Sequence, residues 1–163
     1  MSKEITKKLF ENFMQHATPQ DEAVMLLLLN GFQKKQQGQF SRYIDSTLHM
    51  ERQFTEDTST ITIPITPVIH NYIQTPHGGI IATIADAAMG ELATQSLPDG
   101  FNVVTTNMNI NYLQTTTNNQ LIAKGSFIRK GRTFIVMECV VEDETGKMLA
   151  TASASFYVVK IRK

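Results

Sequence analysis

The sequence has little cysteine, no long apolar run and no excess of charge of either sign. Its one cysteine, Cys139, has no partner for an internal disulfide, and the apolar run around it, FIVMECVV, favours a small buried side chain over a reactive thiol. The longest apolar run, residues 23–29, is far too short to cross a bilayer. Fifteen basic and fifteen acidic residues cancel, so no general field draws the chain to nucleic acid or anionic lipid. We therefore expect neither a nucleic-acid partner nor a membrane partner.

The first residues show no targeting pattern. In MSKEITKKLFENF, charges interrupt the apolar positions, which is typical of neither a signal peptide nor a membrane span. A lone cysteine suits a reducing compartment. The 163 residues, 42% of them hydrophobic, suffice for one sizeable core. We expect a soluble cytoplasmic protein with one main globular domain.

The first part of the chain is predicted to be helical. Helical periodicity runs from Lys3 to about Gln37, and the segment Thr18–Glu22 provides a break and a new helix N-terminus. Two helices are therefore expected. The polar stretch QKKQQGQ that follows marks a boundary, which divides the chain into an N-terminal helical extension, residues 1–40, and a main domain, residues 41–163.

The main domain is predicted to contain one central helix and an antiparallel sheet. Alternating patterns predict a hairpin and then four further strands. The expected strands are residues 48–54, 60–66, 103–112, 121–129, 133–142 and 149–159. Gly131 and Gly146 lie in turns between the later strands, where tight hairpins need a positive φ. This order indicates an α+β domain whose sheet packs on the central helix.

The central helix lies in NYIQTPHGGIIATIADAAMGE, residues 71–91, and is expected from Gly79 to Leu92. At about 100° per residue, one face is apolar and should lie in the sheet. It comprises Ile80, Ile81, Ile84, Ala85, Ala88 and Leu92. The opposite face comprises Gly79, Ala82, Asp86, Gly90 and Ala93, which are all small except Asp86. A solvated face would carry Lys, Glu and Gln, so we predict a packed face, most simply a subunit interface. The alternative is a surface that is merely small.

The start of this helix suits an anion. Helix N-termini leave amide N–H groups unpaired and carry positive potential, and glycine at positions 78 and 79 lets a carbonyl approach those groups. Asp86 follows Gly78 by eight residues, or about 12 Å of helix, so one carbonyl carbon cannot touch both. An antiparallel second copy of the helix would bring Asp86 of one chain near Gly78 of the other. Asp86 also has structural interpretations, as a loop cap or as a partner of Arg132 or Lys130.

Several motifs together resemble a known family. Asn71, His77-Gly78-Gly79 and Asp86 at these spacings, followed by TTNMNINYLQ and the FIRKGRT hairpin, are similar to the hotdog-fold acyl-CoA thioesterases of the PaaI-like and 4-hydroxybenzoyl-CoA thioesterase group. The similarity runs from about residue 47 to residue 159. The resemblance implies a hotdog fold, an antiparallel sheet wrapped around a central helix.

The resemblance also implies roles for individual residues. Gly78 would offer its backbone N–H to the thioester carbonyl, and Asp86 would act from the partner subunit as general base or nucleophile. Asn71 would orient the water or the carbonyl. A Ser or Thr early in the following strand can assist, for which Thr105 is preferred over Thr106. This shifts the interpretation of Asp86 from structure towards catalysis.

Substrate contacts are expected at two further places. Arg129, Lys130 and Arg132 surround a turn that, by the same resemblance, contacts the phosphates of coenzyme A; the alternative is a solvated hairpin tip. His77 and Gly79 adjoin the thioester, with His77 as a hydrogen-bonding residue rather than a base. The remaining histidines, His16, His49 and His70, show no metal-ligand spacing with one another or with Cys139. No metal is expected, and no cofactor other than coenzyme A as part of the substrate.

The sequence therefore predicts an acyl-CoA thioesterase with its site at the interface of a homodimer or of a dimer of dimers. The alternative is a non-catalytic hotdog module that binds acyl-CoA. A hotdog dehydratase is disfavoured because the His-Phe-Pro type motif that such enzymes carry is absent. The long N-terminal extension and the asparagine-rich residues 107–111 depart from the family pattern and bear on the choice of substrate.

Overall fold

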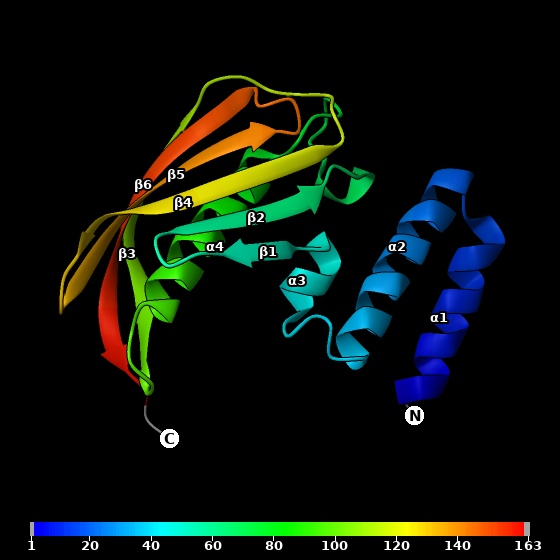
Figure 1. The fold of residues 1–163 in the computed structure, drawn as a ribbon. Coiled ribbons are helices and arrows are strands. Elements are labelled where there is room, and N and C mark those ends of the chain that lie inside the picture. The colour runs from blue at the N-terminus through cyan, green and yellow to red at the C-terminus, as the bar shows by residue number, and fades with distance from the viewer. Residues whose placement is uncertain (1, 162–163) are drawn as a thin grey trace. The chain divides into compact units, whose positions relative to one another are not determined.

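The structure is a computed structural model that describes residues 2–161, and the chain falls into two compact units that meet at His49 and Met50 in the sequence. The first unit contains α1 (Ser2–His16), α2 (Pro19–Gln36) and the short α3 (Tyr43–Leu48) (Figure 1). The two expected helices are confirmed. The division into an extension, residues 1–40, and a main domain, residues 41–163, remains a prediction about which parts fold independently.

Local contacts explain where α2 begins. Thr18 caps the helix: its Oγ1 accepts a hydrogen bond from the Asp21 N–H at 3.2 Å, and Asp21 Oδ2 accepts one from the Thr18 N–H at 2.9 Å. Pro19 occupies the first turn, where its missing N–H costs nothing. The Thr18 hydrogen bonds also lower the pKa of the Asp21 carboxyl.

The structure corrects the expected strand over residues 48–54. Leu48 ends α3, His49 takes a left-handed conformation with φ 50°, and the strand begins only at Glu51. The short α3 is held by a tertiary contact that sequence periodicity does not reveal. A Cβ added to Gly31 of α2 would lie 2.0 Å from the Ser46 carbonyl oxygen, so only glycine permits α2 and α3 to pack this closely.

The second unit is a six-stranded antiparallel sheet that curves around one long helix, α4 (Gly78–Gln95) (Figure 1). The strands are β1 (Glu51–Phe54), β2 (Thr58–Pro64), β3 (Phe101–Tyr112), β4 (Gln120–Lys130), β5 (Phe134–Asp143) and β6 (Met148–Lys160), and a 3-10 turn, η1 (Pro67–Ile69), precedes α4. Their order across the sheet is β1-β2-β4-β5-β6-β3. The predicted α+β class, with an antiparallel sheet wrapped around a central helix, is confirmed.

The core lies between α4 and the concave side of the sheet. The fully buried residues of α4 are Ile81, Ile84, Ala85, Ala88, Met89, Leu92 and Ala93. Ser59 of β2 donates a buried hydrogen bond to the Ala88 carbonyl oxygen at 2.7 Å. A Cβ on Gly125 of β4 would meet Ser59 Oγ at 2.7 Å, so the helix rests against the sheet where no side chain intervenes.

The small face of α4 was predicted to form a subunit interface, but its C-terminal half is part of this core. Ala93 is fully buried, and a Cβ on Gly90 would lie 3.2 Å from the buried ring of Phe156 on β6. The curved sheet wraps past a single face of the helix, so the C-terminal half of the small stripe packs inside its own chain. Ala82 and Asp86, in the N-terminal half, are half-buried and Gly79 is exposed, so only this half is left for a partner.

Glycine is required at Gly131 and at Gly146 for different physical reasons. Gly146 has φ 81°, as a tight hairpin requires. The expectation of a positive φ at Gly131 is wrong, because the residues with positive φ do not include it. A Cβ at Gly131 would lie 2.4 Å from the Phe134 carbonyl oxygen, so close approach of the backbone, rather than φ, requires glycine there.

Two buried side chains of β5, Cys139 and Asp143, can titrate. Cys139 on β5 is buried, and burial raises the pKa of its thiol to about 12, which confirms the expected inert side chain. Asp143, also fully buried, accepts hydrogen bonds from the hydroxyl groups of Thr145 at 2.6 Å and Thr116 at 2.8 Å, and from Asn118 Nδ2 at 2.8 Å. These bonds hold its pKa well below the ordinary range.

Within residues 2–161, no helix is long and apolar enough to cross a membrane.

Candidate active site

The N-terminus of α4 is capped by its own histidine. His77 is the N-cap residue, and its Nδ1 accepts a hydrogen bond from the Gly79 N–H at 2.9 Å. The His77 carbonyl oxygen accepts hydrogen bonds from the N–H groups of Ile80 and Ile81 at 2.9 and 3.2 Å. The Gly79 N–H, which was expected to be available to a substrate, is therefore already used by the cap. His77 has a structural role in this cap.

Gly78 keeps a free donor between these contacts. Within residues 2–161, no acceptor takes its N–H, whereas its carbonyl oxygen accepts a hydrogen bond from Tyr112 Oη at 2.9 Å. A Cβ on Gly78 would lie 3.3 to 3.5 Å from ring and hydroxyl atoms of Tyr112, so the tyrosine ring lies directly over the glycine. Gly78 therefore offers one unpaired N–H at the positive end of an 18-residue helix.

Asn71 organises the loop that leads into the helix. Its Oδ1 accepts hydrogen bonds from the N–H groups of Ile73 at 3.0 Å and Thr75 at 3.2 Å, and its Nδ2 donates to Thr75 Oγ1 at 3.0 Å. Gln74, between them, has φ 62°. The side chain thus stabilises a tight turn, and one N–H of Nδ2 is left for a further contact.

Asn71 and Gly78 line the same cavity of about 330 Å³. The other residues of its wall are Ile73, Thr75, Pro76, Ile81, Tyr112, Leu113, Gln114 and Thr115. Its wall combines apolar side chains with a few polar groups, the character of a small-molecule site. The structure thus brings Asn71, His77, Gly78 and Gly79 together at one end of α4.

Asp86 lies in the middle of α4 and is half-buried. Its Oδ1 accepts a hydrogen bond from Thr105 Oγ1 on β3 at 2.9 Å, and within the described residues its Oδ2 accepts none. Among the described residues, Asp86 forms neither of the ion pairs with Lys130 or Arg132 that the sequence suggested; its hydrogen-bond partner is Thr105. Lys130 Nζ instead lies 3.3 Å from Asp57 Oδ1. The carboxylate is therefore oriented by one hydroxyl and has one oxygen available.

A β-bulge explains why Thr105, and not Thr106, contacts Asp86. The pairing of β3 with β6 shifts register between Thr105 and Asn107. Thr106 is the extra residue, and its hydroxyl donates to the Ser155 carbonyl oxygen at 2.9 Å. Bulges redirect side chains in this way.

The basic turn lies at the other end of the helix. Arg129, Lys130 and Arg132 are exposed, and a cleft of about 500 Å³ lies beside them. It is lined by Ser96, Leu97, Pro98, Phe101, Lys130, Gly131, Arg132, Ile135 and Val158. The first three follow the C-terminus of α4, so the cleft is separated from Gly78 by the helix length, about 26 Å for 18 residues.

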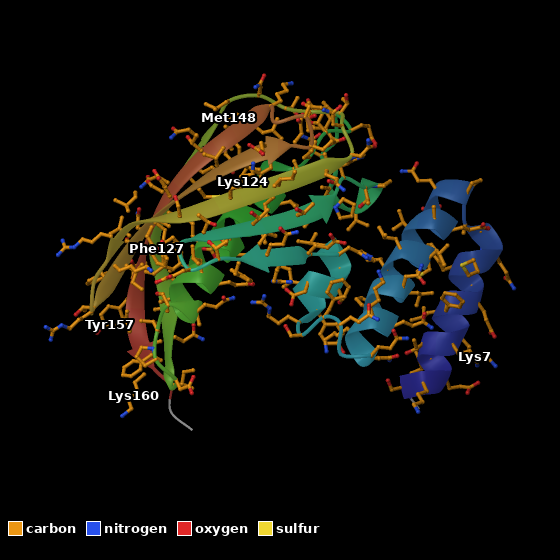
Figure 2. All side chains as sticks on the ribbon, in the orientation of Figure 1. Lys7, Lys124, Phe127, Met148, Tyr157 and Lys160 are labelled. Carbon is orange, nitrogen blue, oxygen red and sulfur yellow. The ribbon has the colours of Figure 1, made fainter. Side chains whose placement is uncertain are left out.

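Labelled residues in Figure 2 mark the two ends of the sheet. Phe127 and Tyr157 are labelled at the end of the sheet where β4 meets β5, and Met148 is labelled at the opposite end. Gln114, in the wall of the cavity beside Gly78, donates from Nε2 to the Met148 carbonyl oxygen at 2.6 Å. One chain therefore places the predicted site residues in three groups: the N-terminus of α4, the Asp86 pair and the basic turn.

Sequence reasoning missed Tyr112, which contacts Gly78 directly. The residue stands in the quoted NINYLQ segment, but a period-2 pattern cannot tell which way it points because the bulge at Thr106 changes the alternation upstream. No group of three or more His, Cys, Asp or Glu side chains within residues 2–161 is arranged to hold a metal ion.

Comparisons with known proteins show the family and the fold of this chain. Residues 33–158 match the family described as "Domain of unknown function (DUF4442)". A protein of Saccharolobus solfataricus named "Putative esterase SSO2140" is 35% identical over 86 residues, which are 53% of this chain and 61% of that protein. The match thus spans less than two thirds of the length of this curated relative.

Two solved structures above 25% identity carry ligands. The BH2602 protein from Bacillus halodurans, crystallised with CoA, is 30% identical, with a TM-score of 0.86 and coverage of 93% of this chain and 99% of that chain. The protein smu.793 from Streptococcus mutans, bound to acetyl CoA, is 28% identical, with a TM-score of 0.62 and coverage of 70% and 91%. Solved thioesterases at lower identity share the fold. The chain belongs to the family described as DUF4442, and its helix and sheet form the hotdog fold expected from the resemblance.

Proposed function

We propose that the protein hydrolyses acyl-CoA thioesters at a site to which two copies of the chain contribute. The observation that carries the proposal is the arrangement on α4. The Gly78 N–H has no acceptor within the described part of the chain, and the half-buried carboxylate of Asp86 follows eight residues later. The CoA and acetyl CoA bound to the two solved relatives support this class of ligand.

The Gly78 N–H would stabilise charge on the thioester oxygen. When water or a carboxylate attacks the carbonyl carbon, the oxygen becomes an oxyanion, and a preorganised donor at a helix N-terminus favours that state over the ground state. Glycine leaves room for the oxygen to approach. The apolar part of the adjoining cavity would receive the acyl group.

Asp86 of the partner subunit would act on the opposite side of the carbonyl. As general base it takes a proton from water, the hydroxyl oxygen bonds to the carbonyl carbon, and the C–S bond breaks to release the CoA thiolate, which is then protonated. As nucleophile its Oδ2 attacks first, CoA thiolate leaves, and water hydrolyses the resulting anhydride. In both versions Thr105 orients the carboxylate, and no cofactor other than the CoA moiety of the substrate takes part.

Two features support a second copy. Gly78 and Asp86 of one chain are separated by about 12 Å of helix, so one carbonyl cannot reach both. β3, which is 12 residues long, lies at the edge of the sheet, and an unpaired edge of this length is a template for pairing with another chain. A homodimer, or a dimer of dimers, built across this side of the molecule would complete the site.

The basic turn would bind the phosphates of coenzyme A. Arg132 and Lys130 line a cleft whose other walls are mainly apolar, which suits a nucleotide with charged phosphates. Because this cleft is about 26 Å from Gly78 of the same chain, the nucleotide and the thioester of one substrate would contact different subunits. A cytoplasmic location completes the proposal, since the free thiol of Cys139 suits a reducing compartment.

A non-catalytic acyl-CoA-binding module is the second candidate. It is favoured by the single free donor at the helix N-terminus, since the Gly79 N–H is already bonded to His77. A binding module would need only to hold the ligand, whereas a hydrolase must also stabilise the developing oxyanion.

The replacement Asp86→Asn separates the two candidates. It preserves the volume and leaves an oxygen for Thr105, but it removes the charge, so kcat should fall by about 10² or more while the melting temperature changes little. Release of CoA from short, long and aryl acyl-CoA esters would be followed with a thiol-trapping reagent. Glu138→Gln, on an exposed site of β5, is the matched control. Tight binding without hydrolysis by the native protein would favour the binding module, and an unchanged rate in Asp86→Asn would exclude Asp86 as base or nucleophile.

A further inference from the structure

The peptide group that joins Gly78 to Gly79 is held at both of its polar atoms. Its carbonyl oxygen accepts the hydrogen bond from Tyr112 Oη at 2.9 Å, and its N–H donates to His77 Nδ1 at 2.9 Å. Tyr112 comes from the end of β3 and His77 from the loop before α4. The two side chains therefore fix this peptide plane between two separate elements of the fold.

The neighbouring peptide group, which carries the Gly78 N–H, is also anchored. Its carbonyl oxygen, that of His77, accepts two hydrogen bonds from Ile80 and Ile81. A carbonyl that accepts hydrogen bonds polarises its own peptide group, which makes the N–H at the other end a stronger donor. Because the His77–Gly78 and Gly78–Gly79 peptide groups are both held by hydrogen bonds, the direction of the Gly78 N–H is set before any ligand binds.

The hydrogen bond from Tyr112 to the Gly78 carbonyl oxygen comes from β3, outside α4 and its N-cap. Glycine has the widest conformational freedom of all residues, so a contact from outside the helix narrows the range of peptide orientations that two adjacent glycines sample in the first helical turn. The ring of Tyr112 also lies over the Cα of Gly78 and lines the cavity. Its side chain is 52% exposed, so it contributes little to the core.

We propose that Tyr112 is a positioning residue that holds the Gly78 N–H in the direction needed to bind a thioester oxyanion. The hydroxyl of Tyr112 acts through the Gly78 carbonyl and does not touch the substrate. The ring is a separate determinant, because it forms the wall of the acyl cavity beside Gly78. This inference rests on the proposed function, but the hydrogen bond it invokes can be tested without turnover.

Tyr112→Phe removes the hydroxyl and keeps the ring. We expect kcat to fall about tenfold, a part of the 10²- to 10³-fold loss typical of removing an oxyanion donor, with KM changed less than about twofold. The preference among acyl groups should stay the same, because the wall of the cavity is intact. Tyr112→Ala, which also removes the ring, should in addition shift the preference towards bulkier acyl groups.

Hydrogen exchange of the Gly79 amide, followed by nuclear magnetic resonance, reports on the peptide itself. In Tyr112→Phe the Gly79 N–H should exchange several-fold faster, because its peptide group has lost one of its two side-chain anchors. Tyr157→Phe is the matched control: its hydroxyl makes no hydrogen bond within residues 2–161, and its ring contacts Phe134 at the opposite end of the sheet (Figure 2). Both the rate and the exchange should be unchanged in that control.

The outcomes distinguish this inference from the proposed function. If native protein hydrolyses acyl-CoA and Tyr112→Phe keeps both its kcat and its Gly79 exchange rate, Tyr112 does not position the donor. If kcat and KM change together with the melting temperature, the role of Tyr112 is structural and the inference fails. If native protein hydrolyses no acyl-CoA, the proposed function fails, and the exchange measurement alone then decides whether Tyr112 holds the Gly78 peptide.

Discussion

At the scale of single residues, the hydrogen bonds around α4 determine which groups remain available to a ligand. His77 takes the N–H of Gly79, and Tyr112 takes the carbonyl oxygen of Gly78, which leaves the Gly78 N–H. Thr105 takes one oxygen of Asp86 and leaves the other. The candidate functional groups are those that the surrounding polar contacts do not use.

Asp143 shows the opposite case, a carboxylate fully used for structure. It accepts three side-chain hydrogen bonds and backbone hydrogen bonds from Thr145 and Lys147, and it joins the turn after β5 to the segment before β4. The Thr145 hydroxyl is the main cause of its low pKa. A buried carboxylate with this many donors stabilises the folded state only while it is ionised.

Asp143→Asn should therefore destabilise the protein in a pH-dependent way. The folded pKa lies below the unfolded one, so the stabilisation is fully present above the ordinary aspartate pKa of about 4 and is lost as the pH falls through the folded value. The melting temperature of the variant should be lower than that of the native protein at pH 7, and the difference should narrow towards pH 2. Thermal unfolding at both pH values measures it, with Asp99→Asn in the exposed loop before β3 as control. A difference independent of pH would show that the charge is not the stabilising feature.

At the scale of helices and strands, the sequence predicted most of the second unit. The strand patterns predicted β3 to β6 to within two residues at each end. In β4, β5 and β6 the signal comes from alternate residues that are buried, whereas β3 has no fully buried residue. The short α3 was missed, since six residues are too few for a periodic signal and Gly31 holds them through a tertiary contact. The packing of Gly90 and Ala93 inside their own chain was missed because a helical wheel cannot show that the neighbouring sheet curves around the helix.

The proposed role of the turn between β4 and β5 in binding coenzyme A can be tested by mutation. Arg132→Gln removes one positive charge from the cleft, and we expect KM for acyl-CoA to rise about three- to tenfold, with kcat little changed, as for an exposed ionic contact worth about 1 kcal/mol. Steady-state kinetics with acyl-pantetheine, which lacks the nucleotide and its phosphates, should show no difference between Arg132→Gln and native protein.

Lys124→Gln provides the control for overall charge. Lys124 lies on β4, the strand that leads into this turn, and its ion pair with Glu142 is on the surface of the sheet (Figure 2). An equal rise of KM in this variant, or a rise that persists with acyl-pantetheine, would mean that the basic turn does not bind the phosphates.

At the scale of the whole molecule, the candidate site residues of one chain lie too far apart to contact one carbonyl group. The N-terminus of α4, the Asp86 pair and the basic turn are spread along one helix, and no bend of α4 brings them together. The sequence predicted this consequence from the eight-residue spacing of Gly78 and Asp86. The sequence predicted pairing through the small face of α4, which stays a prediction. It did not indicate the exposed edge at β3, because that edge follows from the strand order, a property of the complete sheet.

We propose that one thioester contacts Gly78 of one chain and Asp86 of the partner subunit. Gly78→Val places a side chain against Tyr112 and where the carbonyl oxygen would sit, and Asp86→Asn removes the charge, so each variant alone should be inactive. A dimer of one chain of each kind would contain one intact site and one doubly altered site.

The most direct measurement mixes the two inactive variants in equal amounts, allows subunit exchange, and follows acyl-CoA hydrolysis while native mass spectrometry counts the mixed dimers. With random exchange, half of the dimers are mixed and each has one of two sites intact, so we expect recovery of about a quarter of the native activity. No recovery in a sample shown to contain mixed dimers would place both residues in the site of a single chain and contradict the account.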